Sequence, residues 1–312
     1  MRLAEQLLGA GQVDSFFERH WGREPLHLCG DAGRFKPWLD GDRFFALLAE
    51  HGPELPERPS GPAQPAVSMH LAGTRVDRPH EWFAPFSGGW KAESHEQLRR
   101  TCSTLQLLYA YLLDDRLEKL VRDAHRDFEA SITCNGYYSA GSGSMGVSPH
   151  SDRHEVLVLQ CEGEHTWHVD DRRSLSRRAK VERSQAVRRD PSLLPRSFRL
   201  RPGDLLYVPG GTVHYVSGFE GVPSLHLALG VRCPTGRDVL EWLLQSCPED
   251  ALPDDNLWQS GPPGTREPRL VERFQDVCQA QAQVLSSPGA WASFRRYCLL
   301  KELGEMWPPS GQ

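Results

Sequence analysis

Three side chains of this 312-residue chain have the types and the spacing of a metal-binding site. His150 and Asp152 stand two residues apart, and His214 lies far downstream, beyond an apolar segment. Two imidazoles and one carboxylate form the facial triad that binds non-haem Fe(II) and leaves positions on the metal open. The sequence therefore predicts one metal site made by these residues. The residue types alone leave Fe(II), Mn(II), Co(II) and Zn(II) open.

The predicted ligands depend on β-strands to bring them together. Alternate side chains of a strand point to the same face, so His150 and Asp152 in extended backbone reach one ion. The segment 201-RPGDLLYVPGGTVH-214 contains a turn, an apolar strand and a sharp Pro-Gly-Gly turn that leads to His214. This order is typical of cupin-type barrels, in which the strand carrying the last histidine lies across from the first pair.

The hydrophobic pattern changes twice along the chain. Apolar residues recur at helical spacing in residues 1–52 and 94–128, separated by a proline-rich loop at 52–66. Short strands follow a strand-like stretch at 131–138 and a Gly/Ser turn; they are predicted at 154–161, 165–169, 197–200, 204–209 and 224–231. The helical period returns at 236–245 and 268–305. This order predicts a mainly β fold with α flanks, a small barrel or jelly roll.

Three regions follow from this pattern. We expect an N-terminal helical region with the first barrel-supporting elements at 1–128, a catalytic barrel core at 129–235 and a C-terminal helical region at 236–312. The arginine-rich segment 170–196 is predicted to be a solvated insertion, with a substrate-facing basic patch as the alternative.

Composition restricts the class of protein. A net charge of -5 lacks the excess of basic residues that is typical of proteins that bind nucleic acids, so no direct nucleic-acid binding is expected. The eight cysteines are scattered without a C-x-x-C pair, which predicts reduced thiols in a cytoplasmic protein. We see no signal peptide and no membrane-spanning segment in the sequence, so no membrane partner is expected.

Several motifs together resemble the core of the JmjC-type ribosomal oxygenases, a cupin-like group of protein hydroxylases. The matching segments, in order, are 15-SFFERHWGREPLHL-28, 135-NGYYSAGSGSMGVSPHSDRHEVLVLQCEGEHTWH-168, 201-RPGDLLYVPGGTVH-214 and 224-SLHLALGV-231. The likeness covers most of residues 15–235. It implies a double-stranded β-helix (jelly-roll/cupin, JmjC-type), Fe(II) as the metal and 2-oxoglutarate as the co-substrate.

The resemblance also implies roles for single residues. The three predicted ligands match the metal ligands of the family. Tyr138 falls at a tyrosine that reaches the co-substrate or the substrate, and Tyr137 fits equally well if the Gly/Ser turn carries one extra residue. A core aromatic role is the alternative for either. Ser224 is similar to a serine that assists the co-substrate carboxylate, with a backbone-bonded strand serine as the alternative.

The chain departs from the family at one position. Relatives hold the distal carboxylate of 2-oxoglutarate with a lysine or arginine on the strand after the Glu-Gly turn, where this chain has His165. A buried carboxylate needs a fixed cation or several donors. A protonated His165, aided by Tyr138 and Ser224, is one candidate anchor, and Arg232 at the end of the last core strand is another. A weak or altered co-substrate site is the remaining alternative.

The predicted function is an Fe(II)/2-oxoglutarate-dependent hydroxylase of a protein or peptide side chain. The same chemistry on a biosynthetic peptide or a small metabolite is the alternative, and a non-oxygenase metal-binding cupin is the third. No acid–base pair is required, so no catalytic residue is nominated beyond the ligands. His154 and Glu155 are either substrate-facing or structural. A homodimer formed through the C-terminal helices is a further expectation.

Overall fold

The computed structural model describes residues 2–56, 64–76, 103–141, 143, 145–174, 176–246, 275, 278–279 and 281–306. The chain divides into two compact units, Met1–Cys233 and Pro234–Gln312. The first unit contains all the predicted site residues.

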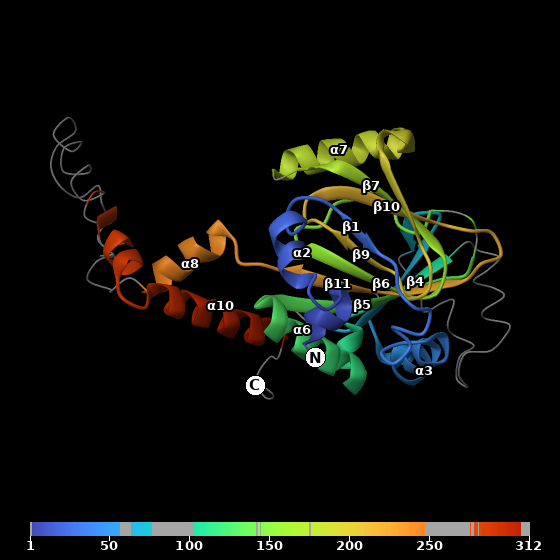
Figure 1. The fold of residues 1–312 in the computed structure, drawn as a ribbon, viewed down its shortest axis with the longest axis horizontal. Helices are drawn as coiled ribbons and strands as arrows, with labels where there is room; N and C mark the ends of the chain where they lie inside the picture. The colour runs from blue at the N-terminus through green and yellow to red at the C-terminus, as the bar shows by residue number, and fades with distance from the viewer. Residues whose placement is uncertain are drawn as a thin grey trace. The chain divides into compact units, whose positions relative to one another are not determined.

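Two antiparallel sheets form the frame of the first unit (Figure 1). The larger sheet has eight strands in the spatial order β1-β9-β6-β11-β5-β4-β2-β3, and the smaller has the order β10-β7-β8. The bounds of the larger sheet's strands are β1 Leu26–Leu28, β2 Ala66–Leu71, β3 Thr74–Val76, β4 Ser103–Leu108, β5 Ser131–Ser139, β6 Glu155–Gly163, β9 Leu205–Val208 and β11 Ser224–Arg232. Those of the smaller sheet are β7 His165–Arg173, β8 Arg196–Leu200 and β10 Thr212–Gly218.

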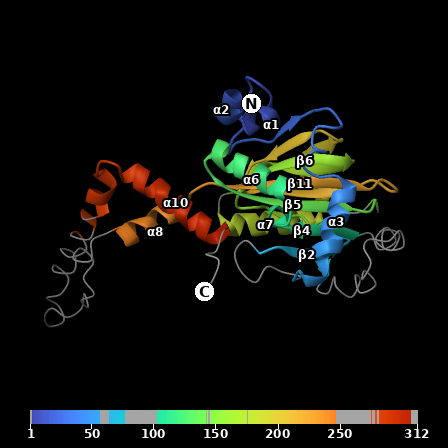
Figure 2. The ribbon, with the colours of Figure 1, turned by 90° about the horizontal axis from the view of Figure 1, so that it is seen from below.

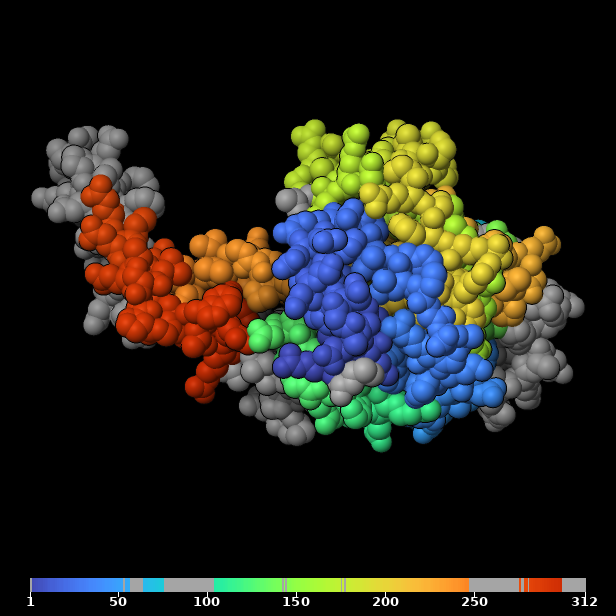
Figure 3. Space-filling model, in the orientation of Figure 1, coloured from blue at the N-terminus to red at the C-terminus, as the bar shows by residue number. Residues whose placement is uncertain are grey.

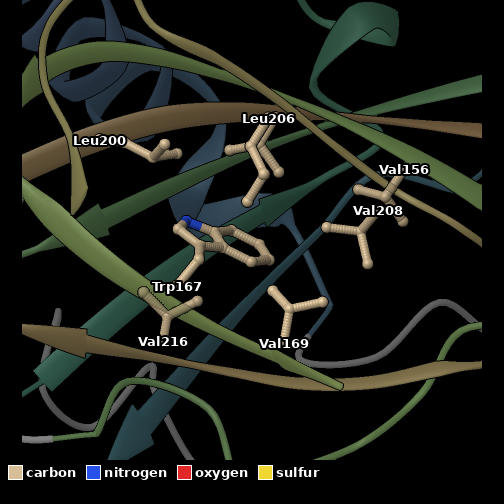
Figure 4. Close-up of a cluster of buried hydrophobic side chains, with 8 residues drawn as sticks. Val156, Trp167, Val169, Leu200, Leu206, Val208 and Val216 are labelled. Atoms are coloured by element: carbon tan, nitrogen blue, oxygen red, sulfur yellow. The ribbon is translucent and has the colours of Figure 1, made fainter. Parts of the chain in front are cut away.

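The interior between the two sheets is apolar on the side where Trp167 lies. Figure 4 shows Trp167 of β7 in the middle of a cluster that draws on both sheets. Its buried members are Val156, Val158, Trp167, Val169, Leu200, Leu206, Val208 and Val216. Because these side chains alternate with outward-facing ones along each strand, the strands present a second set of residues to the outer face.

Helices cover the outer face of the larger sheet. They include α1 Leu3–Leu8, α2 Val13–Arg19, α3 Gly41–His51 and α6 Asp115–Phe128, with short 3-10 turns at Gly52–Glu54 and Ala110–Leu112. Helices α1, α2 and α6 lie beside one another (Figure 2). In the space-filling view the N-terminal segment, in blue, forms a continuous layer on the visible face of the first unit (Figure 3).

Local capping explains where α3 and α6 begin. Asp40 accepts a hydrogen bond from the backbone N–H of Arg43 (2.9 Å). Asp114 accepts from the N–H groups of Arg116 and Leu117 (2.8 and 3.1 Å). Arg43 also pairs with Asp114 (2.6 Å), which ties the two helices together at their starts. Side-chain oxygens at this position satisfy N–H groups that have no partner within the helix.

Two predictions about elements are wrong in part. Residues 103–112, predicted to be helical, form β4 and a 3-10 turn, and the helix α6 begins only at Asp115; residues 94–102 lie outside the described part. The N-terminal region contains a strand, β1, that was not predicted. The arginine-rich segment 170–196, predicted to be a solvated insertion, contains the helix α7 Arg177–Arg189 and a 3-10 turn at Pro191–Leu193. Figure 1 shows α7 above the smaller sheet.

The second unit is helical where it is described. Its named helices are α8 Gly236–Ser246 and α10 Ala290–Met306. Trp242, Leu243, Phe294 and Cys298 form a small core between them. Among the described residues of the whole chain, no helix has the length and apolar character needed to cross a membrane. All six cysteines in the described ranges are free thiols.

Candidate metal centre

The structure brings the three predicted ligands together through backbone hydrogen bonds. His150 and His214 form an isolated antiparallel bridge, in which each N–H donates to the other's carbonyl (3.1 and 2.9 Å). The carbonyl of Asp152 accepts from the N–H of Gly211 (2.7 Å). His150 and Asp152 were expected on one strand, but residues 150–152 form no strand, and His150 makes only the isolated bridge to His214. His214 lies within β10, a strand that was not predicted as such.

The side-chain atoms of these residues converge on one point. The Oδ2 atom of Asp152 lies 3.9 Å from His150 Nε2 and 3.6 Å from His214 Nε2. All three potential ligand atoms lie within 4.8 Å of one another. The remaining ring nitrogens are hydrogen-bonded: His150 Nδ1 to the Ser148 carbonyl (2.9 Å) and His214 Nδ1 to the Thr212 carbonyl (3.0 Å).

This arrangement fits a divalent metal ion. A carbonyl acceptor keeps the proton on Nδ1, so the Nε2 lone pair of each imidazole is directed to the shared point. Two imidazole nitrogens and one carboxylate oxygen would hold the ion, and a donor set of this kind leaves positions on the metal open for further ligands. The donor set therefore suits Fe(II).

The charge state of the ligands agrees with this fit. Burial lowers the pKa of His214, and the neighbouring His150 lowers it further, so His214 is neutral at neutral pH. Burial raises the pKa of Asp152, but His150, His214, His154 and Lys180 together outweigh it, and the pKa lies below its usual value. Neutral imidazole and ionised carboxylate are the forms that bind metals.

A buried carboxylate supports the turn that precedes β10. Glu155 Oε2 accepts from the Tyr207 hydroxyl and from the N–H of Gly210 (3.0 Å), while its Oε1 pairs with Arg173 (3.1 Å). Arg173 also donates to the Gly210 carbonyl (2.5 Å). Glu155 therefore has the structural role that the sequence left open, because it fixes the turn from which Gly211 holds Asp152.

The two neighbouring tyrosines of β5 point to opposite faces. Tyr138 packs on Phe44 and Phe45 of α3, with ring centroids 5.9 and 4.7 Å apart, on the outer face. Tyr137 stacks on His226 of β11 at 4.9 Å, on the face that lines the interior. Alternation along β5 therefore turns Tyr138, the preferred candidate for the residue near the co-substrate, to the outer face and its alternative, Tyr137, to the interior.

Ser224 and His165 both lie in the interior, and Arg232 does not. Ser224 is buried and its hydroxyl accepts from Gln160 Nε2 (2.7 Å). His165 is only 3% exposed, and burial lowers its pKa to about 4, which makes it neutral at neutral pH rather than the cationic anchor that the sequence suggested. Arg232 is exposed at the far end of β11, six residues beyond His226. The structure therefore does not bring Arg232 to the ligands.

Sequence reasoning missed two interior side chains, Trp167 and His226. Trp167 stacks on the predicted ligand His214 (5.6 Å) and contacts His226 edge-on (5.6 Å). A signal for both existed in the sequence. Trp167 follows His165 by two residues on β7, and His226 follows Ser224 by two on β11, so each shares a face with a predicted site residue.

His27, Cys29 and Asp204 form a second group of potential ligands. Both carboxylate oxygens of Asp204 are already bonded, to His27 Nε2 (3.0 Å) and to the N–H groups of Arg201 (3.0 Å) and Gly30 (3.2 Å). This group therefore supports the turn before β9 rather than a metal ion.

Comparison with known proteins gives consistent matches. Residues 109–239 match the model of the JmjC domain. The chain is 33% identical to ribosomal oxygenase 1 of Rattus norvegicus over 318 residues, which covers 98% of this chain and 49% of the relative. It is 35% identical to ribosomal oxygenase 2 of the same organism over 234 residues, covering 72% and 46%. The chain thus spans about half the length of these relatives.

Solved structures agree on the fold. The Escherichia coli ribosomal oxygenase YcfD, solved in complex with cobalt and 2-oxoglutarate, matches with a TM-score of 0.56 at 18% identity, over 90% of this chain and 68% of that one. With the two antiparallel sheets, this likeness confirms the predicted fold class, a mainly β JmjC-type barrel with helical flanks.

Proposed function

Because the chain carries a JmjC domain of the ribosomal oxygenase type, we propose that it is an Fe(II)- and 2-oxoglutarate-dependent oxygenase that hydroxylates a side chain of a protein or peptide. The observation that carries this proposal is the convergence of His150, Asp152 and His214 on one point. The relatives support it, since they are named as ribosomal oxygenases and, in Culex quinquefasciatus, as a bifunctional lysine-specific demethylase and histidyl-hydroxylase.

In this proposal His150 Nε2, His214 Nε2 and a carboxylate oxygen of Asp152 hold the metal. Fe(II) with 2-oxoglutarate supplies the oxidising chemistry that places an oxygen atom from O2 into a C–H bond. The chain's own contribution is positioning. The Ser148 and Thr212 carbonyls orient the two imidazoles, and the apolar cluster beside Trp167 keeps water from the inner side of the site.

Access to the centre is one-sided, which supports a large substrate approaching from outside. The side chains of His150 and Asp152 are 38% and 30% exposed, whereas that of His214 is 3% exposed. Helix α7 lies next to the open side. Arg188 donates to the Pro149 carbonyl (3.2 Å), and the charge of Lys180 acts on Asp152. We propose that α7 borders the substrate entrance.

The test of the proposed function is turnover by the purified full chain with Fe(II), ascorbate and 2-oxoglutarate. We expect succinate formation, and we expect Asp152→Ala to abolish it together with the stabilisation by Mn(II) in a thermal shift assay. Loss of a ligand typically removes most of the affinity of a three-ligand site. Asp171→Ala on β7, an exposed aspartate of the same charge, is the control and should behave as wild type.

The substrate class is tested by mass spectrometry of cells with and without the protein. A mass increase of one oxygen atom on a protein, present only with the active chain, supports the protein substrate. If only a small metabolite gains one oxygen atom, the substrate is a metabolite rather than a protein, which was the alternative from the sequence. If the metal-loaded chain binds no 2-oxo acid, a non-oxygenase cupin would replace both.

We further propose that the second unit forms a homodimer contact. Leu240 and Leu244 of α8 lie one helical turn apart and are 60% and 58% exposed, and Trp291 of α10 is also largely exposed. Exposed apolar residues of this size mark interaction surfaces. A dimer in sedimentation velocity that becomes monomeric in Leu240→Glu/Leu244→Glu supports this. A wild-type monomer at micromolar concentration contradicts it.

The cytoplasm is the proposed location. The free thiols of the described cysteines are consistent with a reducing compartment.

A further inference from the structure

Beyond the metal centre, the interior holds a compact group of polar rings. We call His165, Trp167 and His226 the inner cluster. His165 and Trp167 each lie 5.6 Å from His226, measured between ring centroids. Trp167 also stacks on the ligand His214 at 5.6 Å. The inner cluster therefore begins one side chain away from the metal site and leads away from it.

The inner cluster contains buried polar atoms without hydrogen-bond partners. They are His165 Nδ1, Trp167 Nε1 and His226 Nδ1. The three side chains are 3%, 5% and 4% exposed. In Figure 4 the indole nitrogen of Trp167 lies on the side of the ring that faces Leu200, the residue paired with His165. Buried polar atoms in folded proteins almost always have partners, so three adjacent exceptions indicate a missing ligand.

The chemistry of the unpaired atoms defines that ligand. An indole N–H only donates, and each histidine can offer one N–H, so the ligand must bring acceptor oxygens. Gln160, which pairs with His226 across the strands, has its Oε1 unpaired as well. Because this acceptor lies beside the donors, the hydrogen-bonding groups here can bind an uncharged polar group as well as an anion.

The inner cluster carries no positive charge at neutral pH. Burial lowers the pKa of His165 to about 4. Burial, and to a lesser degree the neighbouring His165, lower the pKa of His226 well below its usual value. Among the described residues, no lysine or arginine lies on the inward face of β7 or β11 beside these rings.

We propose that the inner cluster binds the end of the 2-oxo acid remote from the metal through neutral N–H donors, so that the site recognises acceptor oxygens rather than negative charge. This inference rests on the proposed function and specifies how its co-substrate is selected. A cationic anchor strongly favours a carboxylate over a ketone of the same shape, whereas neutral donors bond to both.

Calorimetric titration of the Mn(II)-loaded full chain tests this with three 2-oxo acids of similar size. They end in a carboxylate (2-oxoglutarate), a methyl ketone (2,5-dioxohexanoate) or a methyl group (2-oxovalerate). We expect the first two to bind within about tenfold of each other, and 2-oxovalerate to bind about tenfold more weakly than 2-oxoglutarate.

Variants assign the effect to the inner cluster. Trp167→Phe keeps an aromatic ring but removes the indole N–H donor. It should weaken the binding of 2-oxoglutarate and of the ketone about three- to tenfold and leave the affinity for 2-oxovalerate unchanged. His165→Lys should raise the preference for 2-oxoglutarate over the ketone at least about tenfold. His168→Lys is the matched control: it adds the same charge to the outward face of β7, and should change nothing. If His165→Lys does not fold, His165→Gln, which keeps a neutral donor, should retain the wild-type preference.

Two results would overturn the inference. A wild-type preference for 2-oxoglutarate over the ketone of more than about a hundredfold would mean that a cation reaches the site. Equal affinity for 2-oxovalerate and 2-oxoglutarate would mean that the inner cluster does not contact the ligand. If Mn(II) binds but none of the acids does, the proposed function itself fails, and that outcome is distinct from the other two.

Discussion

Some residues of this chain support the candidate metal centre indirectly, through contacts with other side chains. Tyr207 is fully buried, and its hydroxyl accepts from the N–H of Gly22 (2.7 Å) while donating to Glu155. Its ring also packs on Phe16 and Trp21. One side chain therefore joins the N-terminal segment to the carboxylate that fixes the turn before β10.

Replacing Tyr207 with phenylalanine should reduce the free energy of unfolding by about 1–3 kcal/mol. The ring contacts remain, but Glu155 loses a donor and the Gly22 N–H loses an acceptor. Chemical denaturation followed by circular dichroism measures the change. Tyr215→Phe on β10 is the comparison, with an expected change of less than about 1 kcal/mol; equal losses in the two variants would contradict the role given to Tyr207.

At the residue scale, the sequence predicted the three candidate metal ligands that the structure brings together, because their types and order are unusual. It left Tyr137 and Tyr138 unresolved, since two adjacent residues on a strand differ only in the face they present and the register depends on a distant partner. Pairing of Tyr137 with His226 decides this, and that pairing joins segments far apart in the chain.

At the scale of elements, the turn between β9 and β10 determines whether the ligands meet. Gly211 has φ +88°, in the left-handed region, and a Cβ added there would lie 2.5 Å from the Ser174 carbonyl oxygen. The same residue holds the Asp152 carbonyl through its N–H. Only glycine satisfies both conditions at this place.

Gly211→Ala should therefore destabilise the protein by about 2–4 kcal/mol and also weaken Mn(II) binding, because the clash adds to the backbone strain and displaces Asp152. Gly221→Ala is the matched control: its φ is +73°, and an added Cβ meets nothing within 4 Å. We expect it to show the strain alone, about 1–2 kcal/mol, with metal affinity unchanged. Thermal denaturation and metal titration measure both quantities, and unaltered metal affinity in Gly211→Ala would refute the coupling.

The sequence predicted β5 to β9 and β11, but it did not predict β1, β2, β3, β4 or β10 as strands. Of these, β4 was expected to be helical. Leu105, Leu108 and Tyr111 have spacing that also fits a helix, and a short apolar run does not distinguish the two. In the structure Leu105 and Leu107 share one face, while Thr104 and Gln106 point to the other and are also buried. Because both faces of β4 are covered, the strand lacks the alternation of apolar and exposed polar residues that would identify it from the sequence.

On the scale of the whole molecule, buried neutral histidines make stability depend on pH. Burial lowers the pKa of His165 to about 4 and that of His226 well below 6.5. Below about pH 6.5 the unfolded chain takes up protons that the folded chain does not, so stability falls as the pH falls towards 4. The loss is about 1.4 kcal/mol per pH unit for each such histidine.

Urea denaturation of the metal-free protein at pH 7 and pH 5 should show this loss, and His165→Gln should reduce its size by removing one titrating group. A wild-type free energy of unfolding that is the same at both pH values would contradict the prediction.

The sheet order has a practical meaning for anyone who wishes to work with a smaller piece. Strand β5 is flanked by β4 and β9 by β1, and both neighbours come from the first 128 residues. A fragment cut to residues 129–235 would keep every predicted ligand but would expose the edges of two strands, β5 and β9, and the tyrosine rings that their covering segments bury. Exposed strand edges pair with strands of other chains, so we expect the excised fragment to aggregate. A smaller piece that stays in solution therefore needs the N-terminal residues that form β1 and β4.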